Sequence, residues 1–195
     1  MRTKAAGFTL VELMVVCSIL APILYLFLSA GPSVGDALGV NQRNADVAQK
    51  ARIGLSSICN SLRSASARSL LVRVASSWVT PVEGTAYGTI QFQEPAGLPT
   101  ASTVALQAPR MLEFKLDPKE IQNGIDDDGD GLVDEGSVWT TRSGGERACL
   151  ASDIESFSVV KTGRLLRITI QSCALDSKQR PHRSKSVQTM VLRND

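Results

Sequence analysis

The sequence predicts an α+β fold in which a long N-terminal helix, membrane-spanning in its first half, packs on an antiparallel β-sheet. Three observations predict it. A predominantly apolar run occupies residues 8–30. Apolar residues then recur every three or four positions from Val40 to Ala65, which indicates an amphipathic helix. After Trp78 the chain changes to turns and short runs in which apolar and polar residues alternate, as they do in half-buried strands.

The first thirty residues read as a short basic leader followed by a membrane span. Residues 1–7 carry Arg2 and Lys4 without an acidic residue, and the apolar run 8–30 is long enough to cross a bilayer as a helix. The positive-inside tendency keeps the N-terminus cytoplasmic and sends the remainder across the membrane. Glycine and proline then cluster in residues 31–39, which predicts a break or bend in the helix there.

One carboxylate stands inside the apolar run. Residues 7–16 read Gly-Phe-Thr-Leu-Val-Glu-Leu-Met-Val-Val, and the glutamate is Glu12. A charge at membrane depth is costly without a partner, so such a residue is a functional hypothesis by default. The string resembles the prepilin leader of type IV pilins and type II secretion pseudopilins. That resemblance implies cleavage between Gly7 and Phe8 by a prepilin peptidase, methylation of the new amine, and pairing of Glu12 with the N-terminal amine of a neighbouring subunit.

Two other N-terminal signals fit less well. A secretory signal peptide is cleaved after its apolar stretch, at small residues, and Leu28-Ser29-Ala30 is a poor site of that kind. A lipoprotein signal would use Cys17, but Val16 is bulkier than the residue that normally precedes such a cysteine. The pilin resemblance also implies a pilin-like form of the predicted fold, an inner-membrane location with a periplasmic C-terminal domain, and later a place in a pilus or pseudopilus.

Residues 40–195 are expected to form one periplasmic or extracellular domain. Its amphipathic helix is expected at about residues 40–75, with its apolar stripe against the sheet. Thr162-Gly163 predicts a tight hairpin between two strands. The alternating runs predict strands at 89–93, 111–116, 156–161, 164–171 and 186–193.

An acidic loop occupies residues 123–135. Counted from Asp126, carboxylates stand at positions 1, 3, 5 and 9 and glycine at position 6, which matches the spacing of a calcium loop. Position 12 is Ser137, where an EF-hand has glutamate. The segment from Asp117 to Glu135 has only Lys119 to oppose its acidic residues, so a structural Ca²⁺ is expected. The predicted ligands are Asp126, Asp128, Asp130, the carbonyl of Leu132, and Asp134.

The remaining polar chemistry is sparse. A disulfide between Cys149 and Cys173 is expected if the predicted hairpin brings them together in an oxidising compartment, and Cys59 is expected to be buried and reduced. The sequence has one histidine, His182, and no phosphate loop or G-x-S-x-G motif, so no enzyme is predicted. The basic residues near residue 180 are more typical of a solvated hairpin tip than of a nucleic-acid site.

The sequence therefore predicts a structural subunit: a minor pilin or minor pseudopilin, near the tip of its filament, with the prepilin peptidase, other pilin subunits and the inner membrane as partners. The C-terminal run 186–195 contains Leu-Arg-Asn and resembles the terminal strand of PilW and J-type minor subunits. The alternative is a single-pass, membrane-anchored calcium-binding domain or enzyme that is not assembled into filaments.

Overall fold

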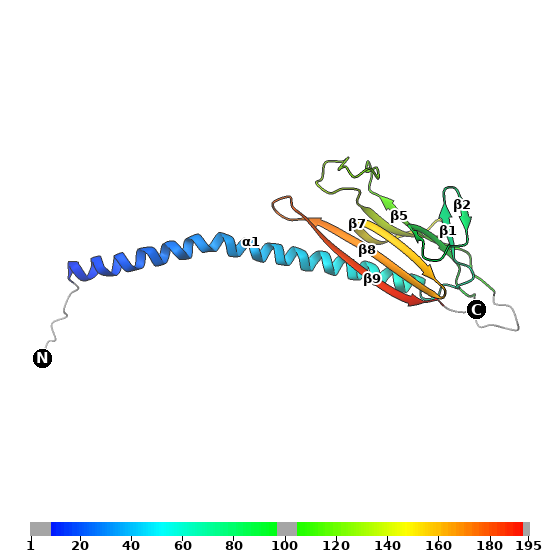
Figure 1. Ribbon diagram of the computed structural model, residues 1–195, viewed down its shortest axis with the longest axis horizontal. Helices are drawn as coiled ribbons and strands as arrows, with labels where there is room; N and C mark the ends of the chain where they lie inside the picture. The colour runs from blue at the N-terminus through cyan, green and yellow to red at the C-terminus, as the bar shows by residue number, and fades with distance from the viewer. Residues whose placement is uncertain (1–8, 97–104, 193–195) are drawn as a thin grey trace. The chain divides into compact units, whose positions relative to one another are not determined.

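The computed structural model describes residues 9–96 and 105–192 (Figure 1). Within them the chain forms one helix, α1 (Leu10–Leu62), followed by strands, which confirms the α+β prediction. The strands are β1 (Leu71–Val74), β2 (Ser77–Val79), β3 (Ala86–Tyr87), β4 (Thr89–Phe92), β5 (Arg110–Leu116), β6 (Gly136–Arg142), β7 (Arg147–Thr162), β8 (Leu165–Leu175) and β9 (Pro181–Val191). The chain divides into two compact units, Met1–Gln42 and Arg43–Asp195.

Helix α1 is continuous through residues 31–39, so it is not interrupted where the sequence predicts a break or bend. Proline removes one helical hydrogen bond, but its fixed φ is compatible with a helix. Glycine is tolerated inside a helix at about 1 kcal/mol per residue. In this segment those local costs do not stop the helix.

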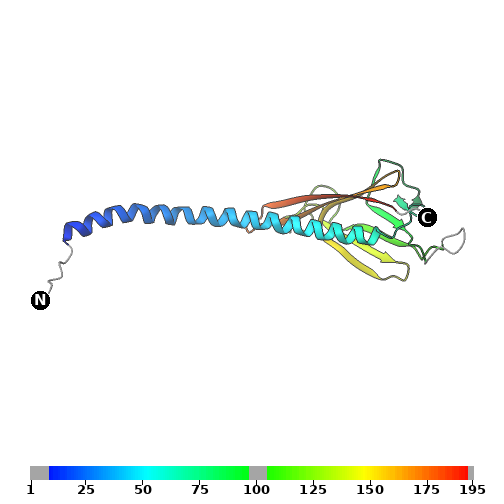
Figure 2. The ribbon, with the colours of Figure 1, turned by 90° about the horizontal axis from the view of Figure 1, so that it is seen from below.

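The second part of α1 packs on the sheet, as predicted. Its buried side chains recur every three or four residues and belong to the core: Val47, Ala51, Leu55, Ile58 and Leu62. From the sheet, Ile90, Leu112, Ile168 and Ile170 complete this core and are fully buried. Figure 2 shows the cyan end of α1 alongside the strands. The alternating burial along β4 and β8 explains why these runs form strands with one face against α1.

The helix ends at Leu62, whereas the sequence predicted helix to about residue 75. Past Leu62, hydrogen bonds to Gln93 take the place of further helical bonds, and one of them uses a serine side chain. The N–H of Ser66 donates to the carbonyl of Gln93, and the hydroxyl of Ser69 accepts from the N–H of Gln93 at 2.9 Å. These bonds tie the chain to the end of β4. Residues Leu71–Val74 are consequently the strand β1.

The strands form one antiparallel sheet in the order β2-β1-β4-β5-β6-β7-β8-β9, with β3 paired to β7. Strands β7, β8 and β9 lie side by side in Figure 1. The five predicted strands fall within β4, β5, β7, β8 and β9, apart from residues at their ends. Strands β1, β2, β3 and β6 were not predicted.

The β7–β8 hairpin has a different register from the predicted one. Thr162 pairs with Leu165, so the two loop residues are Gly163 and Arg164. Gly163 has φ +57°, and a type II′ turn needs such a φ at its first loop position. Thr162 would be strained there. The shift by one residue changes every neighbour of β8 on β7.

Candidate assembly segment and cation site

Gly7 and Phe8, the predicted processing residues, lie outside the described residues. Glu12, the predicted assembly residue, lies in the first turn of α1. Its carboxylate accepts hydrogen bonds from the N–H of Thr9 at 2.9 Å and from the Thr9 hydroxyl at 3.0 Å. The Thr9 hydroxyl in turn accepts from the N–H of Glu12 at 3.3 Å. This reciprocal pair is a capping box, and it fixes where the helix begins.

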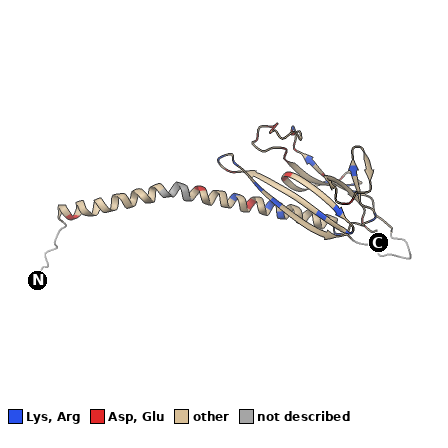
Figure 3. Ribbon diagram, viewed as in Figure 1, with Lys and Arg blue, Asp and Glu red and all other residues tan. Residues whose placement is uncertain are grey.

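The residues that follow Glu12 form an exposed apolar helical surface. Leu10–Ser29 is the one helical segment in the described residues that is long and apolar enough to cross a membrane, and none of it is buried. Glu12 is the only charged residue in this segment, which is tan beyond it in Figure 3. Exposed leucine, isoleucine and phenylalanine side chains over this length need an apolar environment.

The acidic loop is the connection between β5 and β6. Leu116 pairs with Gly136 at the base of this hairpin, and the N–H of Asp117 donates to the carbonyl of Glu135 at 3.0 Å. A Cβ on Gly136 would lie 2.2 Å from the Lys115 carbonyl oxygen, so only glycine fits at this position. The two ends of the loop are therefore held together by the sheet itself.

Glu120 organises the interior of the loop. It is buried, and its two carboxylate oxygens accept three backbone hydrogen bonds, from Asp127, Asp128 and Asp134. Asp126 performs a similar role for the glycines, because it accepts from the N–H of Gly129 at 2.6 Å and of Gly131 at 2.8 Å. Both carboxylates hold the curled backbone in place.

Carboxylates gather in two groups that share Asp128. In each group one carboxylate oxygen per residue lies within 4.8 Å of the others. The first group is Glu120, Asp126 and Asp128, and the second is Asp128, Asp130 and Glu135. Glu135 is 2% exposed, and neither of its carboxylate oxygens has a hydrogen-bond partner in the described part of the chain. Burial, reinforced by neighbouring carboxylates such as Asp130, raises the pKa of Glu135 to about 7.

Three of the five predicted calcium ligands come together in these groups, namely Asp126, Asp128 and Asp130. Asp134 is in neither group, and its oxygens accept from the N–H groups of Asn123 and Gly124. The N–H of Leu132 donates to Asp130, and a metal role for the Leu132 carbonyl remains a prediction. Sequence reasoning missed Glu120 and Glu135, which stand outside the D-x-D-x-D-G spacing.

The predicted disulfide is absent: all four cysteines are free thiols. Cys149 lies opposite Trp139 on β6, whereas Cys173 lies opposite Arg183 on β9. The Cys173 thiol donates instead to the carbonyl of Asp153 at 3.6 Å. Burial, with Glu155 nearby, raises the pKa of Cys173 to about 12, so this thiol is unreactive. Cys59 is buried, as predicted.

The basic residues at the β8–β9 turn are partly paired with acidic ones. Asp176 accepts from the backbone N–H and the guanidinium of Arg180, and these bonds hold its pKa well below the usual range. His182 lies 3.4 Å from the same carboxylate. The Arg183 guanidinium donates to Glu155 at 2.6 Å. This pairing lowers the charge available for phosphates.

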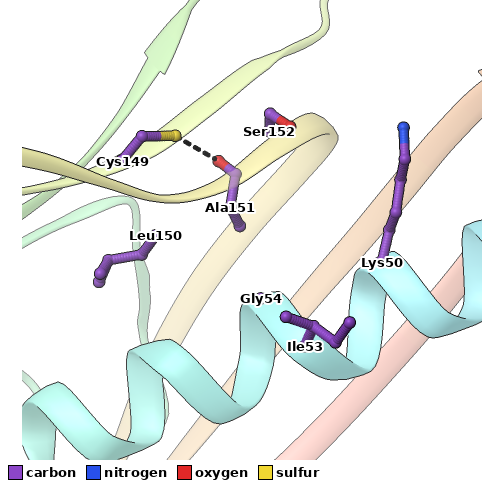
Figure 4. A pocket seen from close by; sticks show the side chains of 7 residues that line it. All are labelled: Lys50, Ile53, Gly54, Cys149, Leu150, Ala151 and Ser152. Carbon is purple, nitrogen blue, oxygen red and sulfur yellow. Dashed lines mark hydrogen bonds between the residues drawn. The ribbon is translucent and has the colours of Figure 1, made fainter.

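A pocket of about 250 Å³ lies between α1 and the start of β7 (Figure 4). Its lining is mostly apolar or backbone, with Lys50 at one side and the Cys149 thiol donating to the Ala151 carbonyl at 3.5 Å. Gly54 permits this close approach, because a Cβ there would lie 2.6 Å from the Ala151 Cβ. The lining residues offer no acid–base pair, so the pocket reflects helix–sheet packing.

Comparison with protein-family models matches residues 2–21 to the prokaryotic N-terminal methylation motif. The match includes Gly7, Phe8 and Glu12, and it implies processing by a prepilin peptidase and assembly with other pilin subunits. No curated protein and no solved structure gives a significant match. The chain therefore carries the N-terminal methylation motif of the type IV pilin and pseudopilin family.

Proposed function

We propose that this protein is a minor structural subunit of a type IV pilus or type II secretion pseudopilus. A prepilin peptidase cleaves it between Gly7 and Phe8, and it passes from the inner membrane into the filament. The observation that carries the proposal is the methylation motif at residues 2–21, continued by an exposed apolar helix that needs either lipid or other apolar helices around it.

The Glu12 carboxylate can be satisfied both in the membrane-bound chain and in the filament. In the single chain its carboxylate is satisfied by Thr9. In a filament, the N-terminal amine of a neighbouring subunit offers a cation, and a charge-assisted hydrogen bond is roughly twice as strong as a neutral one. A cation and an anion that meet only when subunits are in register stabilise the correct packing in an apolar surrounding.

Features of the C-terminal part of the chain favour a minor subunit near the tip. The chain is longer than many major pilins, and its C-terminal run resembles that of PilW and J-type minor subunits. Most of that run lies in β9, at one edge of the sheet. An edge strand has free backbone groups that a neighbouring subunit can pair with.

N-terminal sequencing and intact mass of the protein from cells with a prepilin peptidase test the proposal. We expect a chain that begins at methylated Phe8, and we expect Gly7→Val to block cleavage because a side chain obstructs the scissile carbonyl. An intact Met1, or a start near Gly31, would instead support a membrane-anchored calcium-binding domain or enzyme. The same measurement in cells without the peptidase is the control.

A further inference from the structure

The acidic loop between β5 and β6 contains a buried carboxylate without a partner. Glu135 is 2% exposed, and both of its oxygens lack a hydrogen bond in the described part of the chain. An unpaired carboxylate in such a place is costly, whereas a bound cation would satisfy it. Glu135 also stands directly before Gly136, the first residue of β6, so the sheet fixes its position.

The neighbouring carboxylates of Asp128 and Asp130 each have one oxygen that accepts no hydrogen bond from the residues that the structure describes. Asp128 and Asp130 each use one carboxylate oxygen within the loop, accepting from the N–H of Asp130 and of Leu132. Their other oxygens have no hydrogen bond among the described residues. Glu135 adds two more unused oxygens, and one carboxylate oxygen from each of the three residues lies within 4.8 Å of the other two.

The first carboxylate group differs from this one. Glu120 uses both oxygens on backbone N–H groups, and so does Asp126. These two residues shape the loop, while the second group is left with unused acceptors. Calcium takes six to eight oxygen ligands in flexible geometry, and carboxylates on a curled loop provide them.

We propose that Asp128, Asp130 and Glu135 bind one calcium ion, with Glu135 taking the part that the last glutamate plays in longer calcium loops. The site differs from the one that sequence spacing predicts, because it uses Glu135 from the strand side and leaves Asp134 to cap the backbone of residues 123–124. The proposal is independent of filament assembly.

Calorimetric titration of the calcium-free, full-length protein in detergent micelles with CaCl₂ tests the site. We expect one ion per chain. Glu135→Gln should weaken binding at least about tenfold, because it removes a charged ligand without changing its size. Asp127→Asn is the matched control: the Asp127 carboxylate accepts from the N–H of Ile121 and the amide of Asn123, so binding should be unchanged.

Thermal unfolding keeps the test independent of a folding defect. In chelator, Glu135→Gln should melt no lower than the unmodified protein, since it removes an unpaired buried charge. In the presence of calcium, the unmodified protein should have the higher melting temperature. No saturable binding up to about 10 mM CaCl₂ would overturn the proposal, because extracellular sites bind at about 0.1–1 mM. Equal affinity of Glu135→Gln and the unmodified protein, with loss in Asp134→Asn, would overturn it as well.

Discussion

Thr9 and Glu12 satisfy free backbone N–H groups at the start of α1 through their own side chains. Glu12 therefore has two distinct roles, one that needs a hydrogen-bond acceptor and one that needs a negative charge. One carboxylate oxygen caps the helix, and under the proposed function the negative charge pairs with an amine of another subunit. Neutral glutamine retains the first role and loses the second.

Glu12→Gln and Thr9→Val should consequently differ. We expect Glu12→Gln to insert and be cleaved normally but to be depleted from filaments, because the charge that pairs with the neighbouring amine is gone. Thr9→Val should be incorporated, at a cost to the helix of about 1 kcal/mol for the lost cap. Immunoblots of sheared filaments against membrane fractions measure both. Normal incorporation of Glu12→Gln would show that this subunit needs no charge pairing.

Single residues also show what the sequence predicts and what it does not. Asp126, Asp128 and Asp130 are recognisable because their spacing follows the curl of a calcium loop. Glu135 is not, since its importance comes from burial and from the absence of a partner, which depend on β5 and β6 meeting at Gly136. Gly7 and Glu12 are identified by their order in the chain alone, because they belong to a linear N-terminal motif at residues 2–21.

Among the elements, the contact between α1 and β7 depends on one glycine. Gly54 faces Ala151, and a Cβ on Gly54 would lie 2.6 Å from the Ala151 Cβ. The same Cβ would lie 3.6 Å from the Ile170 side chain. Alanine is a better helix former than glycine by about 1 kcal/mol. Packing and helix propensity therefore act in opposite directions at this position.

We expect packing to win. Gly54→Ala should destabilise the protein by about 1–3 kcal/mol, the usual cost of overpacking a core. Gly39→Ala makes the same change where a Cβ meets nothing within 4 Å, and it should leave the melting temperature unchanged or raise it. Thermal unfolding followed by circular dichroism compares the two. A rise in melting temperature for Gly54→Ala would mean that the helix can move away from β7.

Element types were more predictable than their ends. The apolar stripe along α1 and the alternation in β5 follow from burial of one face, so they are visible in the sequence. The end of α1 at Leu62 depends on hydrogen bonds to Gln93, which lies 31 positions further along the chain. The hairpin register depends on Gly163 taking the first loop position, and the Cys149–Cys173 pairing fails because Cys149 lies opposite Trp139 while Cys173 contacts the Asp153 carbonyl.

For the whole molecule, the core lies entirely within the unit Arg43–Asp195. The α1 residues in it run from Val47 to Leu62, and the sheet supplies the rest. A chain that starts at Arg43 should therefore fold without detergent. A chain that starts at Arg63 lacks the helical side of the core and should not.

Circular dichroism and thermal unfolding of the two fragments check this expectation. The longer fragment should unfold cooperatively near the melting temperature of the full chain. The shorter one should show no cooperative transition, because the apolar face of the sheet, including Ile168 and Ile170, would be left in water. Cooperative unfolding of the shorter fragment would show that the sheet is stable without α1.

The paired base of the β5–β6 hairpin affects which insertions and deletions the protein can tolerate during evolution. Because Leu116 and Gly136 are already neighbours across the sheet, everything between them is topologically a single turn. A chain can gain, lengthen or delete that segment without altering the register of any strand. With the proposed calcium site and the proposed filament role, one insertion or deletion in this hairpin would add or remove a response to calcium and leave helix α1 unchanged.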